Sequence, residues 1–204
     1  MINPRKFQVF DDFISPTYQQ MIKDSISHEN TSWVYQPNMD YGAFDAHDPK
    51  QLEKELNDPT QHSQFLLGIF DSGNIGNEAF YYMLYGFLAK IKDELVPDLH
   101  PYRIRAVLQT PVPNPPHHYI PHTDNNDKGK VSLIYYPHDT TGDTYLFEES
   151  WGNPDDSIRR EHNWNPIDSV TPKQGRLIMF PSDRFHAGSP PKYDRRMLIN
   201  FNYG

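Results

Sequence analysis

A change of hydrophobic period after Pro101 is the feature that most constrains the fold of this chain. From Tyr102 onward, two sets of side chains alternate, a two-residue period that is typical of a β-strand. The apolar set is Tyr102, Ile104, Ala106 and Leu108, and the other set is Arg103, Arg105, Val107 and Gln109. Further strand candidates follow, separated by turns rich in Pro, Gly, Asn and Asp. Short strands joined in this way predict a mainly β sandwich or jelly roll rather than a parallel α/β sheet. The eight predicted strands are Tyr102–Leu108, His118–His122, Lys130–Tyr136, Thr144–Phe147, Asp168–Thr171, Arg176–Phe180, Phe185–Gly188 and Arg196–Tyr203.

The first hundred residues predict a mixed α/β region. Ser15-Pro16 has the residue types preferred at a helix N-cap and first turn, and predicts a helix over Thr17–Ile26. In Asn77–Leu95 the apolar residues recur with helical spacing, and Pro97 ends the pattern. The other expected elements are a short strand at Lys6–Phe10 and a short helix at Gln51–Leu56, the latter within a stretch rich in Asn, Asp, Pro and Gly over 31–72.

The length of 204 residues fits one domain, with residues 1–100 as a helical and mixed support region and residues 101–204 as the β core. Met1–Phe10 lacks the apolar stretch of a signal peptide, and no segment is apolar enough to cross a bilayer. We therefore expect no membrane partner and a cytoplasmic location, in the host cytoplasm if the source is viral. The balance of 19 Lys+Arg against 27 Asp+Glu gives a net charge of −8, which disfavours a nucleic-acid partner.

The chain contains no cysteine. This excludes disulfides, thiolate zinc sites, iron–sulfur clusters and cysteine nucleophiles. A bound metal must therefore be held by histidine, carboxylate or water.

Two of the ten histidines lie in a pattern that indicates such a metal site. His122 and Asp124 are two residues apart, so they point to the same side if the strand extends that far. His186 lies in a later predicted strand that a closed roll can bring next to them. Two histidines and one carboxylate form the facial triad that holds non-haem Fe(II) and leaves three coordination positions open. The three residues together therefore predict an iron site.

Arg196 begins the apolar strand segment RMLINFNY, where an inward-facing guanidinium requires an anionic partner. Its planar donors suit a carboxylate better than lysine does. Asp194 is the only obvious acidic neighbour, so a dicarboxylate ligand is one interpretation. An arginine at the strand edge, paired with solvent, is the other, and Arg195 fits that description.

Over 103–204, the stretches RIRAVLQ, HYIPHTDN, VSLIYYP, GDTYLFEE, PKQGRLIMFPSDRFHAG and RRMLINFNYG resemble the 2-oxoglutarate/Fe(II)-dependent oxygenases. The chain is most similar to the prolyl-4-hydroxylase-like branch and to related proteins encoded by marine phages. The opening FQVFDDFISPTYQQMI also resembles the lead-in strand and helix of that family. The resemblance implies a double-stranded β-helix, a cupin-like jelly roll of eight core strands supported by N-terminal α-helices.

The resemblance also implies roles for individual residues. His122, Asp124 and His186 would ligate iron, and Arg196 would bind the distal carboxylate of 2-oxoglutarate. Tyr136 matches a tyrosine that commonly donates a hydrogen bond to the same carboxylate, and Tyr119 matches an aromatic residue of the pocket lining. Many members carry a serine two residues after the arginine, where this chain has Leu198. Another residue must therefore supply that hydrogen bond.

The activity implied is that of a hydroxylase using Fe(II), 2-oxoglutarate and O2, with ascorbate as a supporting reductant. It would oxidise an unactivated C–H bond and release succinate and CO2. The first candidate substrate is a prolyl or other peptidyl residue. The alternatives are the same chemistry on a small metabolite or nucleobase, and a non-catalytic cupin-like protein that binds a metal or ligand. The last alternative does not explain the presence of Arg196 in an apolar strand.

Overall fold

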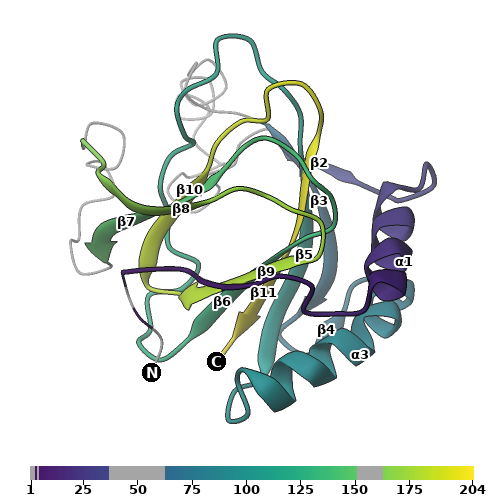
Figure 1. Ribbon diagram of the computed structural model, residues 1–204. Coiled ribbons are helices and arrows are strands. Elements are labelled where there is room, and N and C mark those ends of the chain that lie inside the picture. The colour runs from purple at the N-terminus through teal and green to yellow at the C-terminus, as the bar shows by residue number, and fades with distance from the viewer. Residues whose placement is uncertain (1–2, 4, 37–62, 151–162) are drawn as a thin grey trace, which may run out of the picture.

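The computed structural model describes residues 3, 5–36, 63–150 and 163–204. Two antiparallel sheets face each other, and two helices cover the outer face of the larger one (Figure 1). The larger sheet has eight strands, in the order β1-β9-β6-β11-β5-β3-β2 with β4 paired to β3, and the smaller has the order β10-β7-β8. The fold is thus mainly β, a jelly roll with supporting N-terminal helices. The strands are β1 (Gln8–Phe10), β2 (Val34–Gln36), β3 (Gln64–Asp71), β4 (Asn74–Ile75), β5 (Pro101–Gln109), β6 (Val131–Tyr136), β7 (Thr144–Ser150), β8 (Pro166–Val170), β9 (Arg176–Pro181), β10 (Arg184–Gly188) and β11 (Arg196–Tyr203).

The helices begin where the capping residues of the sequence predict. Helix α1 (Pro16–Ser27) has Ser15 as its N-cap, and the Ser15 hydroxyl accepts a hydrogen bond from the backbone N–H of Tyr18. Helix α3 (Glu78–Glu94) has Asn77 as its N-cap, and the Asn77 side chain accepts from the N–H of Phe80. None of the described helices is long and apolar enough to cross a membrane. The helix predicted at Gln51–Leu56 lies outside the described residues.

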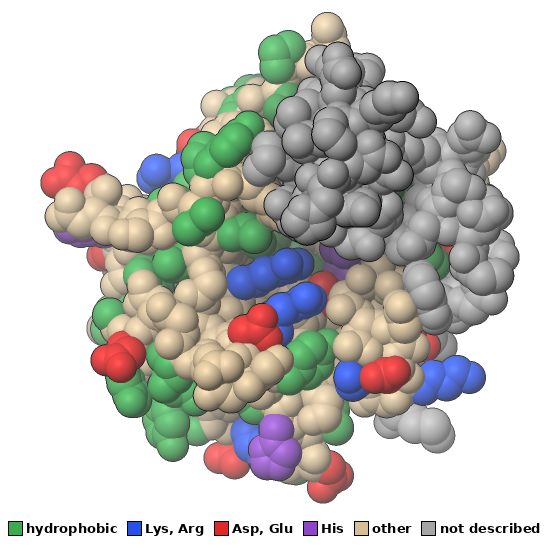
Figure 2. Space-filling model, turned by 180° about the vertical axis from the view of Figure 1, so that it is seen from behind, with side chains coloured by type: hydrophobic (Ala, Val, Ile, Leu, Met, Phe, Trp, Pro, Cys, Tyr) green, Lys and Arg blue, Asp and Glu red, His purple; other side chains and the backbone are tan. Residues whose placement is uncertain are grey.

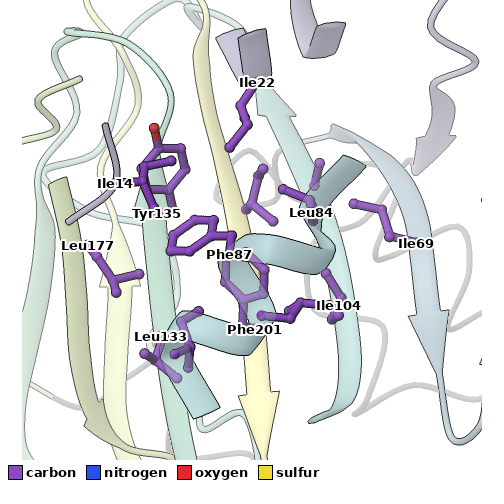
Figure 3. Packing of buried hydrophobic residues seen from close by; sticks show 14 of the residues in the cluster. Ile14, Ile22, Ile69, Leu84, Phe87, Ile104, Leu133, Tyr135, Leu177 and Phe201 are labelled. Atoms are coloured by element: carbon purple, nitrogen blue, oxygen red, sulfur yellow. The ribbon is translucent and has the colours of Figure 1, made fainter. Parts of the chain in front are cut away.

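The main hydrophobic core lies between the two helices and the larger sheet (Figure 3). Phe87 of α3 is fully buried at its centre, with its ring edge-on to Tyr135 at 5.0 Å and to Phe201 at 5.3 Å between centroids. A second cluster lies on the opposite face of the same sheet, inside the roll. Its members are Phe7, Val107, Ile134, Tyr136, Leu146, Val170, Ile178, Phe180 and Leu198.

The strand periodicity explains how one sheet serves both clusters. On β11, Met197, Ile199 and Phe201 point toward the helices, while the alternate residues point into the roll. Adjacent β5 follows the same pattern, with Ile104 and Ala106 on the helix side. The inward-facing residues of these two strands are Arg103, Arg105, Val107 and Gln109 on β5, and Arg196, Leu198, Asn200 and Asn202 on β11.

Two features of the strand prediction are wrong. Strand β3 was not predicted, although it pairs with β5 across most of its length. A bulge between Gly68 and Phe70 shifts the register, so the side chains of β3 do not keep a strict two-residue period. The strand predicted at His118–His122 is not a strand; only an isolated bridge joins His122 to His186. Pro113, Pro115 and Pro116 precede this segment and have no N–H to donate to a ladder.

Candidate metal and cosubstrate site

The structure brings His122, Asp124 and His186 together. His122 and His186 exchange backbone hydrogen bonds of 3.0 and 2.9 Å, and the N–H of Asp124 donates to the carbonyl oxygen of Ser182 at 3.1 Å. One possible ligand atom from each of the three side chains lies within 4.8 Å of the others. An isolated backbone bridge to β10, and not a regular strand at His122, thus holds His122 and Asp124 beside His186.

The burial of these side chains sets their charge. Burial lowers the pKa of His122 to about 3, and the charge of His186 acts in the same direction. Burial also lowers the pKa of His186. For Asp124, burial acts to raise the pKa, but the protonated form of His186 and the Arg103 guanidinium hold it well below its usual range. At neutral pH the three side chains are therefore two neutral imidazoles and one ionised carboxylate. This is the donor set of a non-haem Fe(II) site, so the residues present fit that metal.

Hydrogen bonds from neighbouring strands fix the Asp124 carboxylate. The Ser132 hydroxyl donates to Oδ2 at 2.7 Å, and Arg103 Nη2 donates to Oδ1 at 3.1 Å. The side-chain amide of Asn200 lies 3.3 Å from both oxygens. Such partners orient a metal ligand and maintain its charge. Ser132 and Asn200 belong to no motif, and their only local signal is a polar side chain at an inward position of an apolar strand.

His186 is oriented in a similar way. Its Nδ1 lies 3.2 Å from the carbonyl oxygen of Arg184, which assigns the proton to Nδ1. Its Nε2 then faces Asp124 Oδ2 at 3.7 Å with a free lone pair. This tautomer leaves Nε2 available as a metal ligand.

The second group of predicted residues surrounds Arg196, whose side chain is fully buried. Its guanidinium donates from Nε to the carbonyl oxygen of Gly142 at 2.7 Å, from Nη1 to Gln109 Oε1 at 2.8 Å, and from Nη2 to Thr144 Oγ1 at 2.7 Å. Three of its five N–H donors are thereby used. Within residues 3, 5–36, 63–150 and 163–204, no carboxylate forms an ion pair with it.

Asp194, the neighbouring acidic residue, forms no ion pair with Arg196. Asp194 accepts a hydrogen bond from the backbone N–H of exposed Arg195. Arg195 and Arg196 therefore point to opposite sides, as the strand period predicts. Arg196 is a buried cation whose printed hydrogen bonds go to neutral groups, whereas Arg195 is the solvent-facing arginine.

Two glycines make room for the Arg196 side chain. A Cβ on Gly188 would lie 3.0 Å from Arg196 Nη1 and 3.2 Å from Cζ. A Cβ on Gly142 would lie 2.9 Å from Arg196 Cδ, and Gly142 also has a φ of +98°. No local sequence pattern indicates the role of these glycines, because it depends on which strands become neighbours.

Tyr136 and Tyr119 both lie beside Arg196. The Tyr136 hydroxyl is 2.6 Å from Thr144 Oγ1, and its ring lies 5.8 Å from the guanidinium carbon. The backbone N–H of Tyr119 donates to the carbonyl oxygen of Gly188. Burial raises the pKa of Tyr119 to about 12 and also raises the pKa of Tyr136, so both phenols stay protonated at neutral pH. Both can therefore donate a hydrogen bond.

Leu198, which replaces the usual serine, belongs to the apolar cluster inside the roll. The Thr144 hydroxyl instead accepts a hydrogen bond from the guanidinium, and it also contacts the Tyr136 hydroxyl. Thr144 is a residue of β7, opposite the larger sheet. The polar group thus comes from across the roll.

The two groups of residues lie at the two ends of one interior wall. On β11, Arg196 pairs with Gln109 at one end, Leu198 with Val107 in the middle, and Asn200 with Arg105 near the triad. Four residues of strand separate Arg196 from Asn200, about 13 Å between their Cα atoms. The side chains between them are apolar. An anionic group beside Arg196 and a metal beside Asp124 can be joined by a short, linear molecule in this space.

This geometry agrees with the sequence comparison. Residues 108–204 match the model of the 2OG-Fe(II) oxygenase superfamily. This C-terminal part of the chain belongs to the superfamily. The protein is accordingly an oxidoreductase of the dioxygenase type whose cofactor is Fe(II) and whose cosubstrate is 2-oxoglutarate. No curated relative matches the chain in sequence.

Solved structures share the fold at low sequence identity. A 2OG-Fe(II) oxygenase family oxidoreductase from Burkholderia pseudomallei is 13% identical, with a TM-score of 0.60 over 97% of this chain and 84% of that chain. A prolyl-4-hydroxylase from Pseudomonas putida is 13% identical, with a TM-score of 0.55 over 97% and 91%. HygX from Streptomyces hygroscopicus, with nickel, 2-oxoglutarate and hygromycin B bound, is 12% identical, with a TM-score of 0.58 over 97% and 82%.

Proposed function

We propose that His122, Asp124 and His186 hold Fe(II), and that Arg196 binds the distal carboxylate of 2-oxoglutarate. The observation that carries this proposal is the buried Arg196 guanidinium, which donates to neutral groups and has no carboxylate in an ion pair with it among the described residues. A buried cation requires an anionic partner, and a dicarboxylate that also reaches the triad supplies one.

The protein residues hold the reactants and exclude water. Arg196 neutralises the distal carboxylate, and Tyr136 and Tyr119 donate to it as neutral phenols. Leu198 and Val107 line the space toward the triad and keep it dry. When bound, Fe(II) supplies the redox chemistry that couples decarboxylation of 2-oxoglutarate, giving succinate and CO2, to oxidation of the substrate. The hydrogen bonds on Asp124 and His186 preserve the ligand geometry.

We further propose hydroxylation of an unactivated C–H bond, with a peptidyl proline as the first candidate substrate. The fold likeness to the Pseudomonas putida prolyl-4-hydroxylase supports this choice. The likeness to HygX, whose structure contains hygromycin B, supports the alternative of a small-molecule substrate. A nucleobase is less favoured by the net charge of −8. The non-catalytic alternative does not agree with membership of an oxygenase superfamily.

The test is succinate formation from 2-oxoglutarate by the purified protein with Fe(II) and ascorbate. Arg196→Ala should lower the rate at least 100-fold, because it removes the anchor of the distal carboxylate. Arg195→Ala is the matched control, since it removes an exposed arginine from the adjacent position, and should stay within twofold of the wild type. His122→Ala should lose both iron binding and succinate formation.

Two results would contradict the proposal: equal loss in the Arg195 and Arg196 variants, or a wild type that shows neither succinate formation nor an anaerobic absorption change with Fe(II) and 2-oxoglutarate. A library of proline-containing peptides, screened by mass spectrometry for the gain of one oxygen, tests the substrate class. Gain of oxygen only by small metabolites would replace the peptidyl substrate with the alternative. The single-domain organisation and the cytoplasmic location stay predictions.

A further inference from the structure

Two arginines of β5 lie next to the triad. Arg103 has a part in the function proposed above, through its hydrogen bond to Asp124, and Arg105 has none. Arg103 and Arg105 are inward-facing residues, opposite Asn202 and Asn200 of β11 in the sheet register. On the face of the molecule shown in Figure 2, basic side chains gather around a hollow, beside an acidic side chain and a histidine. Arginine at two successive inward positions places two positive charges at this end of the interior wall.

The hydrogen bonds of the two arginines differ. Arg103 donates from Nη2 to Asp124 Oδ1 and from Nε to Asn202 Oδ1 at 2.9 Å, so its fork is held in place. Arg105 Nη2 lies 3.9 Å from Asp124 Oδ1, beyond hydrogen-bond distance. Arg105 Nε is buried and has no hydrogen-bond partner within the described part of the chain. Arg105 therefore has donors available for a ligand.

The charges around Arg105 do not balance within the described residues. Asp124 faces both guanidiniums but is also the single carboxylate of the triad. Asp71, the other acidic residue that acts on Arg105, is exposed at the end of β3. Bound Fe(II) and 2-oxoglutarate would cancel each other in formal charge and would leave the excess unchanged.

We propose that the primary substrate carries an anionic oxygen group, a carboxylate or a phosphate, which Arg105 binds beside the metal with Arg103 as a second positive charge. This inference rests on the proposed function, because it takes the triad as the iron site and Arg196 as the cosubstrate anchor. A planar guanidinium forms paired hydrogen bonds with either group. The anionic group would position the reacting C–H bond on the triad side of the interior, away from Arg196.

The test is calorimetric titration of the protein loaded with Mn(II) and saturated with 2-oxoglutarate, without oxygen and at low chloride. Phenyl phosphate, benzoate and benzamide serve as the phosphate, carboxylate and neutral probes. The wild type should bind at least one anion, and benzamide at least tenfold more weakly. Saturation with 2-oxoglutarate prevents the probes from binding at Arg196. The anion that binds more tightly distinguishes a phosphorylated substrate from a carboxylic acid.

Three variants separate anion binding from a structural role. Arg105→Gln should weaken binding of the preferred anion at least tenfold, and Arg105→Lys should retain part of the affinity because it keeps the charge. Arg195→Gln, which removes an exposed arginine elsewhere, should bind as the wild type does. Titration of Mn(II) followed by electron paramagnetic resonance reports whether Arg105 instead supports Asp124.

The inference is overturned if the wild type binds neither anion, or if Arg105→Gln binds both as well as the wild type does. It is also overturned if this variant loses Mn(II) or 2-oxoglutarate affinity to the same extent as anion affinity. Succinate formation separates the two proposals. Succinate without anion binding refutes this inference alone, whereas anion binding without succinate retains the anion site and refutes the oxygenase assignment of the triad.

Discussion

Substitution of Gly188 by alanine tests the idea that a glycine shapes the cosubstrate anchor. The added Cβ would lie 3.0, 3.2 and 3.3 Å from Nη1, Cζ and Nη2 of Arg196. Relief of these contacts requires the guanidinium to move by a few tenths of an ångström. Its bonds to Gln109 and Thr144 are already 2.8 and 2.7 Å long, so it cannot move without weakening at least one of them.

The structure also sets the magnitude of the effect. A hydrogen bond to a charged group contributes about 1.5–3 kcal/mol. Loss of one such bond, with the matching misorientation toward the carboxylate, should raise the Kd for 2-oxoglutarate roughly tenfold to hundredfold. Metal affinity should change much less, because the added methyl group contacts Arg196 and not the triad.

The assay is an anaerobic titration of 2-oxoglutarate into the Fe(II)-loaded protein, followed by absorption. Gly68→Ala is the matched control, since a Cβ at Gly68 has no neighbour within 4 Å. It should bind 2-oxoglutarate as the wild type does. Wild-type affinity in Gly188→Ala, or an equal loss of metal and 2-oxoglutarate affinity, would refute the reasoning.

Three further predictions concern the metal ligands and the core. Asn200→Leu removes the amide that contacts both Asp124 oxygens and should weaken Mn(II) binding about 10- to 100-fold in a paramagnetic resonance titration; unchanged affinity would contradict the role of this contact. Phe87→Ala empties the centre of the main core and should lower the free energy of unfolding by about 3–5 kcal/mol in urea; a loss under 1 kcal/mol would show that the core closes around the gap. The metal-free protein should lose stability as the pH falls from 6.5 toward 3. In this range His122 is protonated in the unfolded chain, whereas its lowered pKa keeps it neutral in the folded state. This histidine adds a slope of up to about 1.4 kcal/mol per pH unit, which His122→Gln should remove from urea titrations at several pH values.

Much of the fold could be predicted because its signals are local. The caps of α1 and α3 lie next to the helices that they begin, and the two-residue period of β5 and β11 is visible within each strand. Strand β3 escaped prediction because its bulge interrupts that period. The strand predicted at His118–His122 is absent because Pro121 within it, and Pro115 and Pro116 before it, have no N–H to donate to a ladder.

The residues of the candidate site also fall into those with a local sequence signal and those without one. The spacing of His122 and Asp124 and the charge of Arg196 within an apolar strand are local signals. The structure brings His122 and Asp124 together and buries Arg196, and their roles as iron ligands and cosubstrate anchor stay predictions. Thr144, Gly188 and Asn200 could not be assigned in advance. Their contacts with Arg196 and Asp124 arise from pairing between strands that are distant in the sequence, which no local pattern reports.

The alternation along β11 has a consequence for how such an enzyme can change. Met197, Ile199 and Phe201 belong to the core that the helices cover, while the residues between them face the reactants. Because the two sets share one backbone but no side-chain environment, a substitution at Leu198 or Asn200 can alter what is bound without disturbing helix packing. Adjacent residues of β11 therefore affect different properties. Substitutions on the face toward the roll interior can change substrate preference, while the residues on the opposite face continue to pack against the helices.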